Sequence, residues 1–188
     1  MRTGTDIAIE PFAYIGDPLP QGTIVGADVF RAMSYGNLAI VDGRQIASPW
    51  RLVTFRMTGS MLISVLEMLL SLPPDPYFPQ VSGMRFDYDS SADPGERILR
   101  ETVHVGGHML LEDQLYSVTV TEGVFAALGL PEEFGETLPD TAFGAVHDLV
   151  SQRGEMGLAT SNRIRDVAAI PGHKEAEGEA RLTEGIRQ

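Results

Sequence analysis

The sequence predicts an α+β protein in which a mixed β-sheet packs with helices, and three observations support this. Short alternating or β-branched stretches recur along the chain, and two longer stretches carry apolar residues at helical spacing. The connections between them are short and rich in Gly and Pro. Of the 188 residues, 43% are hydrophobic, which is enough for a sizeable core. We expect residues 1–170 to form one domain and the charge-rich residues 171–188 to form a flexible tail.

The first third of the chain predicts strands around a loop and a short helix. The loop, Pro11–Gly22, contains prolines and glycines, and Asp42-Gly43 is a hairpin-type turn signal. A short helix is expected at Asp28–Met33. The expected strands are Asp6–Glu10, Leu38–Val41 and Leu52–Met57.

The strongest helix prediction covers Ser60–Leu72. Its apolar residues recur at helical spacing, and Pro73-Pro74 would end it. The stripe consists of Met61, Leu62, Val65, Leu66 and Leu69. We expect this stripe to face the core.

The second half predicts three more strands and a second helix. Gly106-Gly107 predicts a turn, and Thr141–Gln152 predicts a helix. The expected strands are Met84–Tyr88, Ile98–Val105 and Leu115–Thr121. The expected inner face of the helix consists of Ala142, Val146, Leu149 and Val150.

Composition excludes several classes of function. The net charge of −12 and pI of about 4.6 would repel a phosphate backbone, so we expect no nucleic-acid partner. The chain has no cysteine, which excludes disulfides, thiolate metal sites and cysteine nucleophiles. No apolar run reaches the length of about 18 residues that predicts a membrane span. Residues 1–5 show no signal-peptide pattern.

Two groups of residues could be taken for a metal site or a nucleophile. His104 and His108 are four residues apart, which suits a metal pair on a helix, but the intervening glycines favour a turn. A nucleophilic Ser60 is conceivable after Thr58, although helix capping explains both residues more simply. The sequence therefore predicts neither a catalytic residue nor a metal site in this chain.

Acidic residues gather in two further places. Glu132, Glu133 and Glu136 form one group, and Asp87, Asp89 and Asp93 form the other. Neither has the spacing of a calcium-binding loop. A solvated acidic surface is the simpler interpretation, and His147 beside Asp148 is likewise expected at the surface.

One stretch, Gln80–Asp89 followed by Pro94–Ile98, resembles the "QVSGLRF.YD...PG.RV" run of the 5'-nucleotidase family's C-terminal domain. Further resemblances follow in the family's order. Asp6–Ile9 resembles its "DIAL" strand, Tyr35–Asn37 its "PFGN" element, Thr58-Gly59 its "LTG..L" element and Leu115–Val120 its "K.YRVAT" strand. The resemblance implies the fold of that domain, with a mixed sheet packed with helices.

The resemblance also implies a function. In that family this domain recognises the substrate, while a preceding metallophosphatase domain supplies an Asp, His and Asn cluster that holds divalent metals. That cluster is absent from this sequence, so the resemblance implies no cofactor here and a divalent metal only in a preceding catalytic domain. It further implies that Met1 is an internal residue of a longer protein, or the start of a trimmed one, and that the protein works outside the cytoplasm.

The family's nucleoside site is only partly kept. Tyr35 and Asn37 match its first aromatic and its asparagine, whereas Gly16 stands in place of an arginine. Gly123 and Gly129 stand in place of the second aromatic and an aspartate. Losing an arginine and a stacking ring removes most of the affinity for a nucleotide. The resemblance therefore implies a degenerate nucleotide site.

A different, more apolar pocket could replace that site. The Pro11–Gly16 loop carries two aromatic residues and no Lys or Arg, and an insertion between Asn37 and Thr58 brings Trp50, the only tryptophan. The candidate ligand-binding residues are Tyr35, Asn37, Phe12, Tyr14 and Phe78. A nucleoside-like or other small molecule is the expected ligand, and a metallophosphatase domain is the expected partner. The alternative is a stand-alone module for small-ligand or protein binding with the same fold, and a complete small enzyme is a third interpretation.

Overall fold

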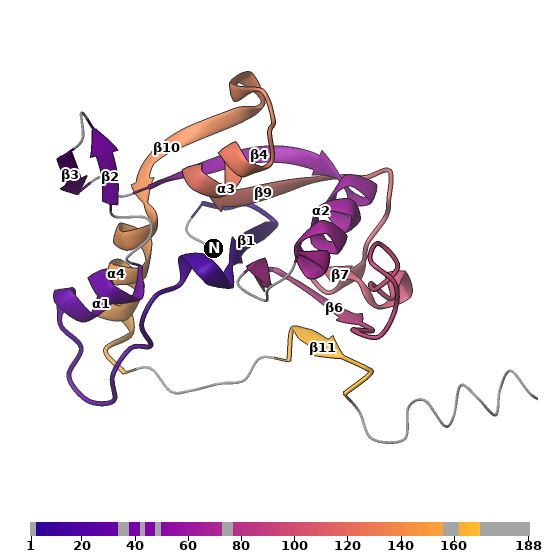
Figure 1. Ribbon diagram of the computed structural model, residues 1–188, viewed down its shortest axis with the longest axis horizontal. Helices are drawn as coiled ribbons and strands as arrows, with labels where there is room; N and C mark the ends of the chain where they lie inside the picture. Colours follow the sequence, from indigo (N-terminus) through magenta and orange to yellow (C-terminus); the bar gives the residue numbers. More distant parts are fainter. Residues whose placement is uncertain are drawn as a thin grey trace, which may run out of the picture.

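The protein is built around a five-stranded mixed sheet with the strand order β10-β4-β9-β1-β5 (Figure 1). The computed structural model describes residues 3–33, 38–41, 44–47, 50–72, 77–155 and 162–169. The strands are β1 (Ile7–Pro11), β4 (Arg51–Thr58), β5 (Pro79–Ser82), β9 (Leu115–Thr121) and β10 (Gly135–Thr141). The central strand β9 is parallel to β1 and antiparallel to β4. The α+β prediction, with a mixed sheet packed with helices, is confirmed.

The two faces of this sheet differ because side chains alternate along each strand. Ile7 and Ile9 of β1 are buried on one face, with the alternate apolar residues of β4 and β9. Ala8 and Glu10 point to the other face, where Thr119 and Thr121 make the surface more polar. The sheet therefore has one fully apolar face and one mixed face, and each bears a cavity.

Helices α2 (Gly59–Ser71) and α3 (Glu122–Ala127) cover the apolar face (Figure 1). As predicted, Thr58 caps α2, because its Oγ1 accepts a hydrogen bond of 3.3 Å from the backbone N–H of Met61. Leu62 and Leu66 are fully buried, which confirms most of the predicted stripe. Met61 itself is 46% exposed, so its place in that stripe was wrong. The helix buries Ile63 instead.

A smaller sheet, in the order β11-β6-β7-β8, lies beside the large one. Its strands are β11 (Ile164–Asp166), β6 (Met84–Tyr88), β7 (His104–Val105) and β8 (His108–Met109). The turn between β7 and β8 confirms the Gly106-Gly107 prediction, since both glycines have positive φ values.

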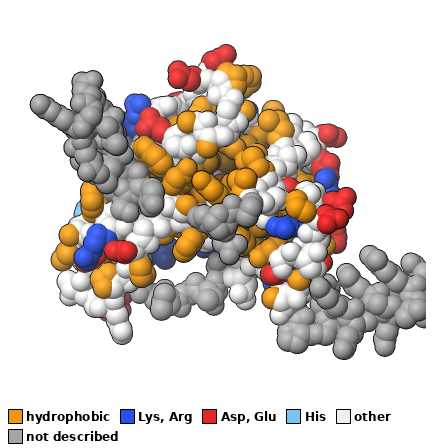
Figure 2. All heavy atoms as spheres, viewed as in Figure 1, with side chains coloured by type: hydrophobic (Ala, Val, Ile, Leu, Met, Phe, Trp, Pro, Cys, Tyr) orange, Lys and Arg blue, Asp and Glu red, His pale blue; other side chains and the backbone are white. Residues whose placement is uncertain are grey.

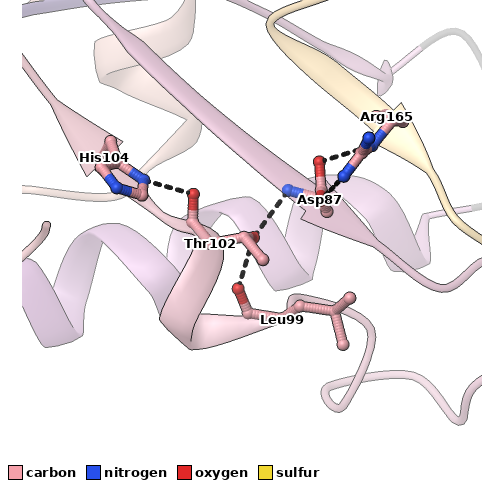
Figure 3. A network of polar contacts seen from close by, with 5 residues as sticks. All are labelled: Asp87, Leu99, Thr102, His104 and Arg165. Carbon is pink, nitrogen blue, oxygen red and sulfur yellow. Dashed lines mark hydrogen bonds and ion pairs between the residues drawn. The ribbon is translucent and has the colours of Figure 1, made fainter. Parts of the chain in front are cut away.

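The predicted strand Ile98–Val105 was largely wrong. The chain instead forms a single bridge at Ile98, a 3-10 helix η4 (Arg100–Thr102) and then the short β7. The hydroxyl of Thr102 donates to the carbonyl oxygen of Leu99 (2.6 Å) and accepts from the backbone N–H of Asp87 (2.8 Å) (Figure 3). The Thr102 hydroxyl thus accepts the hydrogen bond that a backbone carbonyl of a neighbouring strand would otherwise accept. A pattern of β-branched residues does not reveal such a substitution.

The remaining elements lie at the ends of the large sheet. Helix α1 (Gly26–Ala32) packs against α4 (Ala142–Arg153), and the rings of Phe30 and Phe143 are 6.4 Å apart. Strands β2 (Leu38–Val41) and β3 (Arg44–Ala47) form a hairpin. Leu149 is 45% exposed, so the prediction that it faces inward was wrong, because α4 buries mainly Ala142 near its start. No helix in the described ranges is both long and apolar enough to cross a membrane.

Two further 3-10 helices complete the described elements, η1 (Phe12–Tyr14) and η5 (Glu132–Phe134). The first interrupts the loop predicted at Pro11–Gly22. The tail predicted at 171–188 lies outside the described residues, so it stays a prediction.

Candidate ligand-binding site

The apolar face of the large sheet contains a cavity of about 140 Å³ between α2 and α3. Figure 2 shows hydrophobic side chains gathered in a hollow in the middle of this face. Its floor consists of sheet residues such as Phe55 and Val118, and its rim carries Tyr14 and Tyr77. The lining residues are Ile9, Pro11, Tyr14, Phe55, Met57, Val65, Met68, Leu69, Leu72, Tyr77, Val118, Val120, Val124, Ala127 and Leu128. A cavity of this size and apolarity suits a benzene-sized ring.

An aromatic corner, which we define as Tyr14 and Trp50 with Gly123, lies at the edge of this cavity. The two rings meet edge to face with their centroids 5.0 Å apart. Trp50 also lies directly on Gly123, because a Cβ placed there would come within 2.4 Å of the indole ring. The glycine is therefore required for this packing, and the indole occupies the space where a side chain at position 123 would lie.

Arg51 and Glu122, which are neighbours of Trp50 and Gly123 in the sequence, form an ion pair beside this corner. The guanidinium of Arg51, the residue after Trp50, lies 2.8 Å from the Glu122 carboxylate. The backbone N–H of Arg51 also donates to that carboxylate, at 2.9 Å. An arginine with such a partner is less available to a phosphate group. Burial raises the pKa of the Tyr14 phenol, which therefore stays protonated at neutral pH.

The predicted ligand residues fall in different places. Phe12 is 56% exposed and lines neither the apolar cavity nor the cavity on the mixed face. Phe78 packs against Tyr88, with ring centroids 5.8 Å apart, and lines the cavity on the mixed face. Of the predicted set, Tyr14 alone lines the apolar cavity among the described residues. Tyr35 and Asn37 lie outside the described residues.

The other two glycines singled out in the sequence have structural roles. The backbone N–H of Gly16 donates to the carbonyl oxygen of Ala32 (2.8 Å), which fixes the loop after η1 to the end of α1. Gly129 follows α3 with a φ of +65°. This left-handed conformation is the usual way to end a helix, and glycine adopts it at little cost.

Sequence reasoning missed Glu10, which lies on the mixed face in a cavity of about 570 Å³. Its carboxyl is half-buried and accepts a 3.1 Å hydrogen bond from the hydroxyl of Thr121. Burial raises the pKa of Glu10 to about 7, and the hydrogen bonds with Thr121 oppose that rise. The available signal was a lone charged residue inside a strand, between Ile9 and Pro11.

The histidines do not form a site within the described residues. His104 lies on β7, where its Nδ1 is 2.8 Å from the carbonyl oxygen of Thr102, and His108 lies across the turn on β8 (Figure 3). His147 is exposed and stacks on Phe143, as expected for a surface position. Among the described residues, no three His, Asp or Glu side chains lie together so that they could hold a metal ion.

Comparison with known structures shows the same fold in several larger hydrolases. A 5'-nucleotidase precursor from Thermus thermophilus is 22% identical, with a TM-score of 0.74 over 90% of this chain and 33% of its own. A sulfate thiohydrolase from the same genus is 18% identical (TM-score 0.66, 90% and 30% covered). An NAD nucleotidase from Haemophilus influenzae is 14% identical (TM-score 0.68, 86% and 30% covered). The chain thus spans about a third of the length of these proteins.

A family assignment follows from the sequence match. The model of the family described as "5'-nucleotidase, C-terminal domain" matches residues 1–129. That range includes β1, β4, β5 and β9 of the large sheet, and the helices α2 and α3 on its apolar face. No curated protein matches the chain. Because the family match extends over more than half of the residues, the chain belongs to the 5'-nucleotidase C-terminal domain family.

Proposed function

We propose that this chain is the substrate-recognition domain of a 5'-nucleotidase-like metallophosphohydrolase. In this proposal a metallophosphatase domain supplies the catalytic metals, and this domain holds the non-reacting part of the substrate. Family membership and the fold shared with larger hydrolases support this role. Binding energy from remote groups of a substrate can be used to orient its reacting group.

The aromatic corner and the apolar cavity are the proposed recognition site. The observation that carries this proposal is the indole of Trp50, which covers Gly123 and meets Tyr14 edge to face. A nucleobase that lay against Gly123 would need the space that the indole fills, whereas the adjoining cavity has room for an apolar ring. We propose that the domain recognises an uncharged ring of its substrate and that its nucleotide site is degenerate.

Charge supports the same preference. The net charge of −12 disfavours the approach of an anion, and Arg51 is held by Glu122. A nucleotide phosphate near the aromatic corner would therefore gain little from this cation. A neutral ring would instead gain from removal of its apolar surface from water.

The intrinsic fluorescence of Trp50, the only tryptophan, provides the test. We expect toluene to change this fluorescence saturably, and AMP to bind more weakly than about 10 µM, or roughly −7 kcal/mol. Tyr14→Ala should weaken toluene binding, whereas Phe12→Ala should not, because Phe12 lies on the same 3-10 helix but faces solvent. Tighter AMP binding, or equal toluene binding by both variants, would contradict the proposed site.

The catalytic part of the proposal needs separate tests. Extension of the reading frame upstream of Met1 into a metallophosphatase domain would support it, and a stand-alone gene would favour the non-catalytic binding module. We also expect the isolated chain to release no phosphate from AMP with added divalent metal. Metal-dependent release that survives repurification would contradict this.

A further inference from the structure

Glu10 occupies an unusual position for a carboxyl group. It projects from β1 onto the mixed face of the large sheet, into the cavity of about 570 Å³. That volume is in the range of about 300–1,000 Å³ typical of small-molecule sites. The walls come mainly from β1, β4, β5, β9, α4 and β11, and several of their residues are apolar: Ala8, Leu52, Phe78, Ala142, Val146 and Ile164.

The carboxyl of Glu10 is hydrogen-bonded by Thr121 and has no counter-charge among the described residues. The Thr121 hydroxyl donates to Oε1 at 3.1 Å. Arg163 also lines the cavity, but its Nη1 donates to the carbonyl oxygen of Val81 at 2.6 Å, and the described ion pairs do not include Glu10. An ionised carboxylate that is partly withdrawn from water without a cation is unfavourable. A bound cation would compensate for this.

We propose that this cavity binds a small organic cation, an ammonium group carried on a hydrocarbon chain or ring, with the Glu10 carboxylate as its counter-charge. The ammonium would donate to Glu10, and the hydrocarbon would lie against walls such as Leu52 and Val146. The net charge of −12 favours the approach of a cation. A divalent metal fits less well, because a hard cation needs several oxygen ligands and no acidic cluster lies among the described residues.

This site is separate from the proposed recognition site. Alternation along β1 directs Glu10 to the face opposite the cavity between α2 and α3. Ile9 borders both cavities, whereas Glu10 lines only the one on the mixed face. Loss of ring binding at Tyr14 would therefore leave the cation proposal unaffected.

The pH dependence follows from the groups that face the cavity. Glu10 on β1 and Arg163 beside β11 are its ionisable lining residues in the described part of the chain, while β4, β5, β9 and α4 contribute none. The phenol of Tyr14 interacts electrostatically with Glu10 but stays protonated at neutral pH. Burial raises the pKa of Glu10 to about 7, so a proton competes with the ammonium below that pH. Cation binding should therefore strengthen as the pH rises through about 7.

The test is calorimetric titration of the 188-residue chain with benzylammonium, and with benzyl alcohol as the neutral probe. At about pH 8.5 we expect benzylammonium to bind and Glu10→Gln to weaken it by about tenfold or more. Glu133→Gln is the matched control, since it removes the same charge from an exposed position on η5 and should change binding less than about twofold.

A second measurement keeps the test independent of the variant's folding. The ¹³C shift of the Glu10 carboxyl in the unmodified chain should report a lower pKa in the presence of benzylammonium. The proposal is overturned if benzylammonium does not bind below about 10 mM, if Glu10→Gln and the unmodified chain bind it equally, or if benzyl alcohol binds as well as benzylammonium. An unchanged Glu10 pKa would also overturn it.

Discussion

Replacing Glu10 with Gln should make the protein's stability less dependent on pH. In the folded chain burial raises the Glu10 pKa from 4.5 to about 7. Between these two values the folded state holds a proton that the unfolded chain has lost, so stability falls as the pH rises. The loss begins near pH 4.5 and is complete above about pH 7. At about 1.4 kcal/mol per pH unit, the interval between 4.5 and about 7 corresponds to a loss of at most about 3.5 kcal/mol.

Urea unfolding of both proteins between about pH 5 and pH 8.5 measures this effect. We expect Glu10→Gln to gain stability over the unmodified chain as the pH rises, by up to about 3.5 kcal/mol. Hydrogen bonds lower the pKa values of Asp6 and Asp28, so the stability that these two carboxylates contribute is already complete at the lower end of this pH window. It is the same in both proteins and therefore cancels in the difference between their free energies of unfolding. A difference that stays constant within about 0.5 kcal/mol across the window would show that Glu10 titrates normally.

Three further predictions concern packing. Leu66→Ala removes a fully buried side chain and should cost about 2–5 kcal/mol in urea unfolding. Gly59→Ala should cost about 3 kcal/mol or more, because its Cβ would lie 2.4 Å from the backbone carbonyl oxygen of Leu111, which cannot swing aside. Gly123→Ala should cost about 1–3 kcal/mol and shift the fluorescence of Trp50, since the indole that it meets at 2.4 Å can rotate.

Each of these has a distinct contrary result. If Leu66→Ala lowered the free energy of unfolding by less than about 0.5 kcal/mol, the Leu66 side chain would have to face solvent. Equal stability of Gly59→Ala and the unmodified chain would mean that the loop at Leu111 lies farther from α2 than the structure shows. If Gly123→Ala left the fluorescence of Trp50 unchanged, the indole would not be in contact with Gly123.

Sequence patterns predicted the elements whose burial has a clear period. Strands β2, β6 and β9 were predicted with the observed ends, and β1, β4, α1, α2 and α4 within one or two residues. Period-2 and period-3.6 burial leave a direct trace in the order of apolar residues. Several elements with a weak trace were missed, among them β5, α3, η5, β10 and β11.

The missed elements have particular causes. Strand β10 carries mostly polar residues and ends near a proline, since it lies at an edge of the sheet. Strand β5 begins with Pro79, which is acceptable there because β5 is the opposite edge. Helix α3 has only six residues, too few to show a helical period.

The candidate site could be predicted only in part. The absence of Lys and Arg from the Pro11–Gly16 loop indicated a site of low charge, and Tyr14 lines the apolar cavity. The contact of Trp50 with Gly123 joins residues 73 positions apart through the fold, and no local pattern indicates it. The same applies to the pairing of Glu10 with Thr121, which depends on β1 lying beside β9.

The strand order of the large sheet also determines when during synthesis this domain can fold. Strand β9 lies between β1 and β4, although both are made long before it, and 111 residues separate Asp6 from its partner Ser117. While β9 is still inside the ribosome, β1 and β4 have no strand between them to which both can pair. Until then β1 and β4 each have an unpaired edge, which can form hydrogen bonds with other chains. Completion of β9 is consequently the point at which a newly made chain becomes able to bury its own core.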